Sequence, residues 1–288
     1  MNTQVDSLSI ASESLQGSGG GLLFNEVLFA VAILAFFALV VMEKMQPYRR
    51  FTQQIGKASF VTNTTAFIFN NVILTVLRAS SLFFVAQQFS SFGILSGLSS
   101  GPLKWVLSFI LFDLAIYVWH VASHRFEFLW RFHKIHHSDK SFNVSTGFRF
   151  HVFDLFLEIP YKCLFVILIG VEAHLVLAIE TLELLFIFFH HANLTFKREE
   201  NLSNFIITPS LHRTHHSADR REHDSNYGIV LAIWDKVFGT RKEVVPEKIG
   251  LDIIEAENFL QLFFLAFITE RHIRRILEII PKGKKRGG

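Results

Sequence analysis

Cysteine is nearly absent from this sequence: the 288 residues include one, Cys163, which lies inside an apolar stretch. A single cysteine cannot form an intrachain disulfide, so a disulfide-stabilised secreted scaffold is excluded. Zinc ribbons and iron–sulfur clusters held by several thiolates are excluded for the same reason. Charge is scarce as well, because charged residues make up 18% of the chain, whereas soluble domains usually have about a quarter.

Apolar residues and histidine are abundant instead. Half of the chain is hydrophobic, with 33 phenylalanines, and there are 14 histidines. This hydrophobicity excludes intrinsic disorder, and a net charge of +3 is too small to indicate nucleic-acid binding. No linker separates two globular blocks. We therefore expect a flexible polar tail at 1–21 and a single membrane-embedded domain at 22–288.

Apolar stretches long enough for membrane helices recur along the chain, at about 20 residues per crossing. They cover 22–42, 60–89, 105–120, 152–170 and 174–189, and the last two predict a hairpin. The predicted fold class is all-α: an integral-membrane helical bundle of about four to five spanning helices, with a cytoplasmic helical cap. The stretch 259–268 is too short to span, so 258–288 is predicted to form an interfacial helix and a basic tail.

Basic residues predict the orientation of this bundle. Lys44, Arg49, Arg50 and Lys57 lie in the short segment 43–59, which the positive-inside rule assigns to the cytoplasm. Counting crossings from there puts the polar segments 121–151 and 190–288 in the cytoplasm too. The sequence thus predicts a multi-pass protein of a bacterial inner membrane or the endoplasmic reticulum.

Ten of the 14 histidines fall into four groups, all on the predicted cytoplasmic side. Two groups repeat one pattern, HKIHHS at 133–138 and HRTHHS at 212–217, and the other two are His120/His124 and His190/His191. Spacings of three or four residues bring imidazoles together on one helical face, and imidazole is the commonest metal ligand. This number of ligands predicts two metal ions. His174 and His272 stand alone and are not expected to bind metal.

Ionisable residues in the apolar stretches share helical faces with these histidines. Asp113 precedes His120 by seven residues, with Tyr117 between them, and Glu183 precedes His190 by seven. Acids inside a membrane are costly and are functional candidates. One interpretation is that they accept the outer N–H of a metal-binding imidazole. The alternative is that they pair with polar groups of neighbouring helices, such as Asn70 or Arg78.

With these motifs, the chain resembles the fatty acid hydroxylase/sterol desaturase superfamily, integral-membrane enzymes with a non-haem di-iron site. The resemblance covers 105–242 and rests on His120-x-x-x-His124, WRFHKIHHSDKS (130–141), FHHANL (189–194), LHRTHHS (211–217) and HDSNYG…WDKVFGTR (223–241). It implies the metal ligands His120, His124, His133, His136, His137, His191, His212, His215 and His216. It also implies ligand or supporting roles for His190, His151, Asp224 and Asn226, and no catalytic residue beyond the ligands.

The activity implied by this resemblance is O₂-dependent hydroxylation or desaturation of a sterol, fatty acyl or alkyl-ether lipid by two iron ions. The sequence has no dinucleotide fingerprint or other redox motif, so electrons are expected from an external NAD(P)H-dependent reductase or small carrier. Its candidate docking residues are Lys134, Lys140, Arg213, Arg220 and Arg221. The alternatives are a metal or proton transporter, which histidines on one membrane face disfavour, and an inactive metal-binding scaffold.

Overall fold

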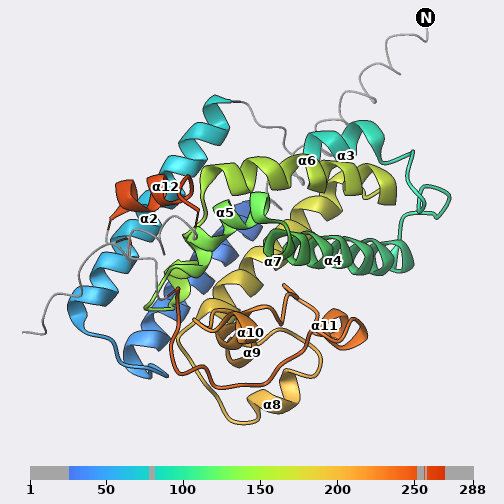
Figure 1. Cartoon of the computed structure of the whole chain (residues 1–288). Helices are drawn as coiled ribbons and strands as arrows, with labels where there is room; N and C mark the ends of the chain where they lie inside the picture. Colours follow the sequence, from blue (N-terminus) through green and yellow to red (C-terminus); the bar gives the residue numbers. More distant parts are fainter. Residues whose placement is uncertain (1–25, 78–81, 252–255, 257, 270–288) are drawn as a thin grey trace, which may run out of the picture.

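Helices make up the regular structure of the part of the chain that the computed structural model describes, residues 26–77, 82–251, 256 and 258–269 (Figure 1). Extended pairing there is limited to two isolated bridges, Ile206 with Leu231 and Ser217 with Ile249. The all-α fold class is therefore confirmed for these residues. The expected tail at 1–21, the basic tail after 269, Arg78 and His272 lie outside the described residues.

The helices follow one another along the chain with short connections. A first helix covers Glu26–Met45. It is followed by α2 (Gln53–Val76), α3 (Leu82–Phe89), α4 (Pro102–Arg125), α5 (Glu127–His137), the 3₁₀ helix η1 (Val144–Phe148), α6 (Val152–Ile169), α7 (Ala173–His191), α8 (Glu199–Leu202), α9 (Pro209–His215), α10 (Arg220–His223), α11 (Ile233–Val237) and α12 (Phe259–Leu265).

Three of the described helices are long and apolar enough to cross a membrane: Glu26–Met45, α4 and α7. The prediction of a single spanning helix at 60–89 is wrong, because two helices lie there: α2 ends at Val76 and α3 begins at Leu82. The span expected at 152–170 corresponds to α6, which also contains Asp154, Glu158, Lys162 and Pro160. The number of crossings and the side of the membrane that carries the cap stay predictions.

The turn between α6 and α7 depends on a close approach of two glycines. Gly170 ends α6 with a φ of 79°, in the left-handed region that favours glycine. A Cβ on Gly93 would lie 1.9 Å from the Gly170 nitrogen, so neither position has room for a side chain. Backbone hydrogen bonds from Ile94 and Leu95 to the last carbonyls of α6 fasten the 90–101 loop here.

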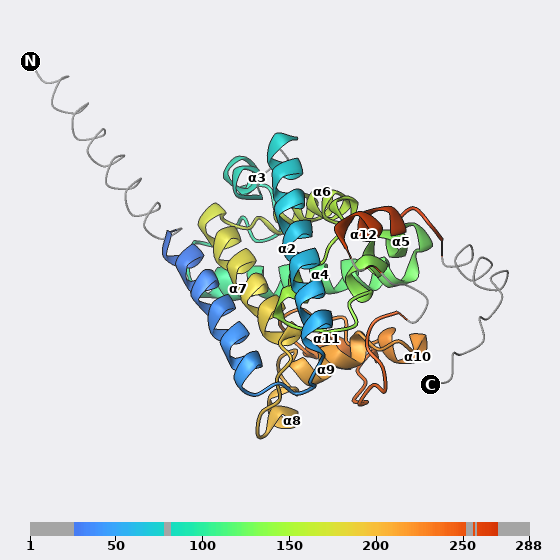
Figure 2. The same ribbon diagram turned by 90° about the vertical axis from the view of Figure 1, so that its left-hand side faces the viewer.

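Beyond this turn α6 and α7 separate, and α3 packs against both of them. Buried apolar side chains of α3, α4, α6 and α7 form the largest core cluster, including Leu82, Phe112, Val166 and Val176. The two helices of the predicted hairpin are thus present in the expected order. They do not pack along each other, because α3 packs against both of them. The first helix runs beside α7 (Figure 2), with Phe36 against Phe188.

The segment from 192 to 251 forms a cap of short helices, α8 to α11, at the carboxyl ends of α4 and α7 (Figure 1). Two residues of α4 fasten it. Asp113 accepts hydrogen bonds from the Trp234 indole at 2.8 Å and from the backbone of Val230 and Leu231. Tyr117 shares a 2.9 Å hydrogen bond with Thr240.

Candidate metal centre

The nine histidines expected as ligands are all buried and lie in two groups. In each group, one nitrogen atom from every member lies within 4.8 Å of the others. The five-histidine group consists of His120, His124, His133, His137 and His215, and the four-histidine group consists of His136, His191, His212 and His216. The structure thus brings together side chains from four helices and 97 positions of sequence, from 120 to 216.

Helical geometry explains how each repeated motif serves both groups. On α5, His133 and His137 are four residues apart on one face and enter the five-histidine group, whereas His136 enters the other. The second repeat, at α9, is used in the opposite sense: His212 and His216 enter the four-histidine group and His215 the other. The two repeats meet where the rings of His137 and His216 stack at 4.4 Å.

Backbone carbonyls and carboxylates hold the outer nitrogens of several rings. The Nδ1 atoms of His120, His191 and His215 donate to the carbonyls of Tyr227, Ile187 and Ser225 at 2.8, 2.7 and 2.6 Å. In the five-histidine group, the Nε2 atoms of His120, His124, His133 and His215 are buried and have no hydrogen-bond partner among the described residues. A bound metal ion would satisfy these atoms, and the outer hydrogen bonds fix the tautomer that directs Nε2 inward.

Spacing in the four-histidine group also suits a metal. The Nε2 of His191 lies 3.1 Å from that of His136 and 3.0 Å from that of His212. Neighbouring imidazole nitrogens bound to one metal ion at about 2.0–2.1 Å are held about 3 Å apart. The residues therefore fit a metal ion in this group as well.

Burial favours the neutral, metal-binding form of five of these imidazoles. Desolvation, reinforced by neighbouring imidazoles, holds the pKa of His137, His212 and His215 well below the ordinary value. The same causes act on His136 and His216. A metal ion therefore displaces no proton from these rings at neutral pH.

Among the described residues, two carboxylates contact the five-histidine group, and one of them was expected. Asp224 accepts from the Nδ1 of His124 at 3.3 Å. Asp154, at the first turn of α6, accepts from the Nδ1 of His133 at 3.0 Å and was not predicted. In the sequence it looks like an ordinary acid at a helix amino terminus, and its 21-residue separation from His133 gives no local signal.

Asp113, Tyr117 and Glu183 do not accept from an imidazole in the described contacts, so that interpretation is wrong for them. Asp113 and Tyr117 fasten the cap instead, because their side chains meet the segment 227–240 two turns and one turn below His120. Glu183 pairs with Lys162 at 3.1 Å. The alternative, pairing with polar groups of neighbouring helices, is confirmed for Glu183, because Lys162 belongs to α6; the suggested partner Asn70 donates to the carbonyl of Phe150 instead.

The other candidate supporting residues lie outside both groups. His151 caps α6, accepting from the Phe153 N–H at 3.2 Å. His190 packs its ring 3.8 Å from that of His212 but belongs to neither group. Asn226, with a φ of 51°, holds α9 to the segment after α11 by bonding the carbonyls of Leu211 and Lys242.

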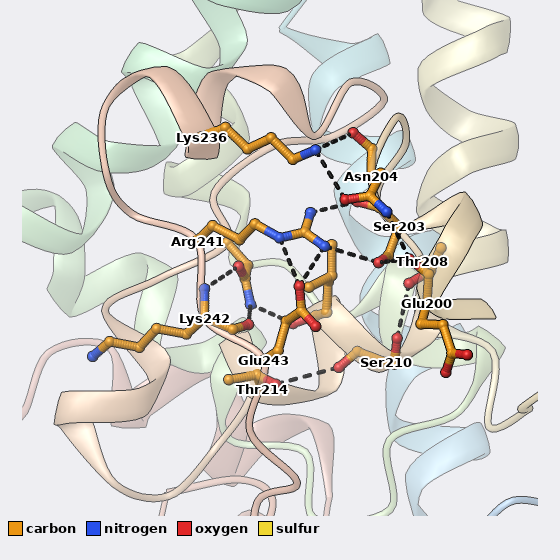
Figure 3. A network of polar contacts seen from close by, with 12 residues as sticks. Glu200, Ser203, Asn204, Thr208, Ser210, Thr214, Lys236, Arg241, Lys242 and Glu243 are labelled. Carbon is orange, nitrogen blue, oxygen red and sulfur yellow. Dashed lines mark hydrogen bonds and ion pairs between the residues drawn. The ribbon is translucent and has the colours of Figure 1, made fainter. Parts of the chain in front are cut away.

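Further polar contacts close the cap beside α9 (Figure 3). Arg241 bonds Ser203 and Glu243, and Lys236 bonds Asn204. These contacts tie α11 and the chain after it to the segment after α8, and the next residue, Lys242, donates its backbone N–H to the Asn226 side chain.

His223 is a buried residue near the site that the sequence did not single out. Its ring stacks on Trp130, with centroids 5.4 Å apart, and its Nδ1 donates to the Ser217 carbonyl at 3.0 Å. With His124 and Asp224 it forms a third set of side chains close enough to share a cation. Its position in HDSNYG, directly before Asp224, was the available signal.

Two of the residues expected on a docking surface are buried, so that prediction is wrong for them. Lys134 donates to the Ile268 carbonyl. Arg213 bonds the Leu194 carbonyl at 2.6 Å and covers the Tyr48 ring at 3.9 Å. Long basic side chains can be held inside by carbonyls and aromatic faces. Arg220 and Arg221 are exposed and Lys140 is half-buried.

A cavity of about 570 Å³ reaches both histidine groups. It is bounded by α2, α4, α5, η1, α6 and α7, and its wall is mainly apolar, including Phe67, Leu74, Phe148, Leu155 and Leu184. His120 and His133 of the five-histidine group and His136, His191 and His212 of the other line its inner end.

A buried polyhistidine centre beside an apolar cavity defines a class of membrane protein able to bind two metal ions. Residues 105–240 match the model of the family described as "Fatty acid hydroxylase". The resemblance of the chain to the fatty acid hydroxylase superfamily is confirmed over these residues. No solved structure matches the chain significantly.

Relatives of the chain carry the names of lipid-modifying enzymes. Ornithine lipid hydroxylase OlsE of Rhizobium tropici is 29% identical over 235 residues, 75% of this chain and 66% of that protein. Alkylglycerol monooxygenase of Caenorhabditis elegans is 33% identical over 194 residues, 66% of this chain and 37% of that protein. Cholesterol 25-hydroxylase of Homo sapiens is 28% identical over 152 residues, 48% of this chain and 52% of that protein. The chain thus spans 66% or less of each relative.

Replacing Asp154 with asparagine is expected to weaken metal binding by about 10- to 100-fold, the usual effect of losing an outer partner of a histidine ligand. The amide keeps the shape of the carboxylate but removes the charge that holds the His133 N–H. Competition with a chelator of known affinity measures the change. Glu172→Gln is the control, because this acid pairs with Lys104 and accepts from Ser100, and contacts none of the predicted ligands; equal losses in both variants would contradict a role specific to His133.

Proposed function

We propose that this protein is a membrane-bound non-haem di-iron oxidoreductase that uses O₂ to hydroxylate or desaturate a lipid. The observation that carries the proposal is the largely apolar cavity whose inner end is lined by histidines of both groups. The family match and the lipid hydroxylases and monooxygenases among the relatives support a lipid-oxidising role.

Each histidine group would hold one iron ion through its Nε2 or Nδ1 atoms. When bound, the two ions would activate O₂, which is the oxidant that attacks an unactivated C–H bond. The chain's own contribution is to keep the imidazoles neutral and to fix their tautomers through Asp154, Asp224 and backbone carbonyls. These contacts prepare the ligands before the metal arrives.

The cavity wall would bind the hydrocarbon part of the substrate and exclude water. Phe150 stacks on His136 with ring centroids 4.4 Å apart, so an apolar surface continues up to the ligands. A chain lying on this surface would present one carbon to the centre in a fixed orientation, which lowers the entropic part of the barrier. Ornithine lipids, alkylglycerols and cholesterol, named in the relatives, are all amphipathic, and we propose a substrate of that general kind.

Electrons would come from a separate NAD(P)H-dependent reductase or small carrier. A surface recess of about 470 Å³ reaches His124 and is lined by Arg125, Arg131 and Arg220. We propose this basic recess as the docking site of the electron donor, because an acidic redox protein bound there would lie next to the five-histidine group. Residues of the predicted cytoplasmic segments form it, which agrees with a soluble donor.

No observation favours the transporter or the inactive scaffold. The histidines of α4 and α7 lie in the last two turns of these helices, at one end of the apolar stretch, whereas a transport site lies near the middle of the bilayer.

The test is to purify the full chain from membranes, measure its iron content, and incubate it with membrane lipids, a reductant and ¹⁸O₂. We expect about two irons per chain and either a lipid product carrying ¹⁸O or an O₂-dependent double bond. A metal-free protein of unchanged thermal stability, or a lipid profile that does not respond to O₂, would overturn the proposal. Stimulated ion flux in vesicles without lipid oxidation would point to transport.

A further inference from the structure

An ionisable cluster lies in the wall of the cavity, away from the histidines. Lys162 of α6 forms ion pairs of 3.1 Å with Glu158, one turn earlier on the same helix, and with Glu183 of α7. Glu180 lines the cavity one turn from Glu183. Because α6 and α7 separate beyond their turn, the pair between Lys162 and Glu183 joins the two helices across the cavity.

Burying these ionisable side chains is unfavourable for the stability of the folded protein. Glu183 lies within α7, one of the three described helices apolar enough to span a membrane, and its side chain is 5% exposed. Such a position is unfavourable for an ionisable group unless its hydrogen-bonding capacity is satisfied. Replacing a buried ion pair by apolar side chains is often neutral or stabilising, so stability alone is a weak explanation for it.

The hydrogen bonding of Glu183 is incomplete in one specific place. Its Oε2 accepts from Lys162 at 3.1 Å, whereas its Oε1 is buried with no hydrogen-bond partner among the described residues. Lys162 is already shared with Glu158. An unsatisfied carboxylate oxygen in a cavity wall is a position for a hydrogen-bond donor supplied from outside the chain.

We infer that Glu183 binds a hydrogen-bond donor, a hydroxyl or a protonated amine, on the lipid substrate. This rests on the proposed lipid-oxidising function and narrows its substrate to amphipathic lipids with such a donor. Lys162 holds the carboxylate in place through Oε2 and leaves Oε1 for the ligand. Because the rest of the cavity wall is mainly apolar, the hydrogen bond to Glu183 would fix how far the lipid enters the cavity.

The position of Glu183 on α7 sets the distance to the histidines. Glu183 precedes His191, a member of the four-histidine group, by eight residues, or about 12 Å along the axis. Both side chains line the cavity. A donor bound at Glu183 therefore places a carbon about 12 Å away beside the metal centre, so the site would select the carbon that is oxidised as well as the lipid.

Binding of three probe lipids tests this inference independently of catalysis. Hexadecanol and hexadecylamine carry a donor, and methyl hexadecyl ether has a similar chain without one. We expect the purified full chain to bind the two donors about 10- to 100-fold more tightly than the ether, the usual effect of a hydrogen bond to a charged group. Retention of only one donor would identify whether the recognised group is the hydroxyl or the amine.

Variants of Glu183 show whether this residue causes the preference for lipids that carry a hydrogen-bond donor. Glu183→Leu is expected to bind all three probes equally, and Glu183→Gln, which keeps a neutral acceptor, to bind the alcohol but lose any preference for the amine. Thr181→Val is the matched control, because its hydroxyl lines the same cavity but already donates to the Leu177 carbonyl. Thermal unfolding in detergent, measured on each preparation, shows whether the variants fold.

The outcomes separate this inference from the function on which it rests. A wild-type chain that binds the ether as tightly as the donors, or a folded Glu183→Leu variant that keeps the full preference, would overturn the role of Glu183. If these preparations still oxidise lipid, the proposed function stands. If the protein prefers donor lipids but neither binds iron nor oxidises lipid, the role of Glu183 in binding stands and the proposed function is overturned.

Discussion

His136→Ala and His215→Ala are each expected to abolish lipid oxidation and to lower bound iron from about two ions per chain to one or fewer. His136 belongs to the four-histidine group and His215 to the five-histidine group. The groups meet through the rings of His137 and His216, which stack at 4.4 Å, so damage to one group should weaken the other. Iron analysis of the purified variants, together with product formation, measures both effects.

The matched control is His151→Asn. His151 is as deeply buried as the predicted ligands, but it caps α6 and lies outside both groups. Asparagine is a good helix N-cap, so this variant should keep its iron and its activity. A His215→Ala protein with full iron content and full activity would show that the groups are not the metal centre.

Asp139→Ala is expected to destabilise the protein by about 3–5 kcal/mol, the cost of leaving the buried guanidinium of Arg149 without its nearby opposite charge. Asp139 follows the first HxxHH motif and is fully buried near Arg149. It accepts hydrogen bonds from Ser59, Asn63 and Thr146, which join α2, the loop after α5 and η1. Arg149 in turn bonds the carbonyl of Ile135 on α5. Removing the carboxylate therefore loosens the support of α5 and its ligands.

The pH dependence of this interaction has a definite sign. Burial opposes the ionisation of Asp139, but Arg149 and the hydrogen bonds outweigh it, so the pKa of Asp139 lies below its ordinary value. A carboxyl with a lowered pKa in the folded state stabilises the protein above its unfolded value of about 3.9, and this contribution is lost as the pH falls.

Denaturant unfolding in detergent at neutral pH measures the loss of stability. Glu243→Ala, at an exposed ion pair with Arg241, serves as the control and should change stability by less than about 1 kcal/mol. The double replacement Asp139→Ala/Arg149→Met should recover part of the loss, because it removes the uncompensated guanidinium as well. A single variant as stable as the wild type would contradict the importance of this pair.

The sequence was a sufficient guide to the nine clustered histidines because their signal is local. Spacings of three and four residues put His120 with His124, and His133 with His137, on one helical face wherever the helix lies. The same local rule could not reveal Asp154 or His223. Their partners are 21 and 99 positions away, His133 and His124, and only packing brings them together.

Several sequence-based predictions failed for a physical reason that they share. Asp113 and Glu183 lie on the expected helical faces, but their partners belong to other segments. Asp113 accepts from Trp234 of the cap, and Glu183 pairs with Lys162 of α6. Lys134 and Arg213 are basic, as the predicted docking surface required, but carbonyls and an aromatic ring hold them inside. Periodicity gives the direction of a side chain within its own helix and says nothing about the neighbour that it meets.

The sequence by itself determined the all-α class of the described residues, the resemblance to the fatty acid hydroxylase superfamily and which histidines cluster, because composition and spacing along single helices express these properties directly. The tertiary structure alone decided how the histidines divide, with the two HxxHH repeats used in opposite senses, and where a carboxylate oxygen is left without a partner beside an apolar cavity. Those features depend on how α4, α5, α7 and α9 come together, and contacts between distant segments are fixed only by the packing of the whole chain.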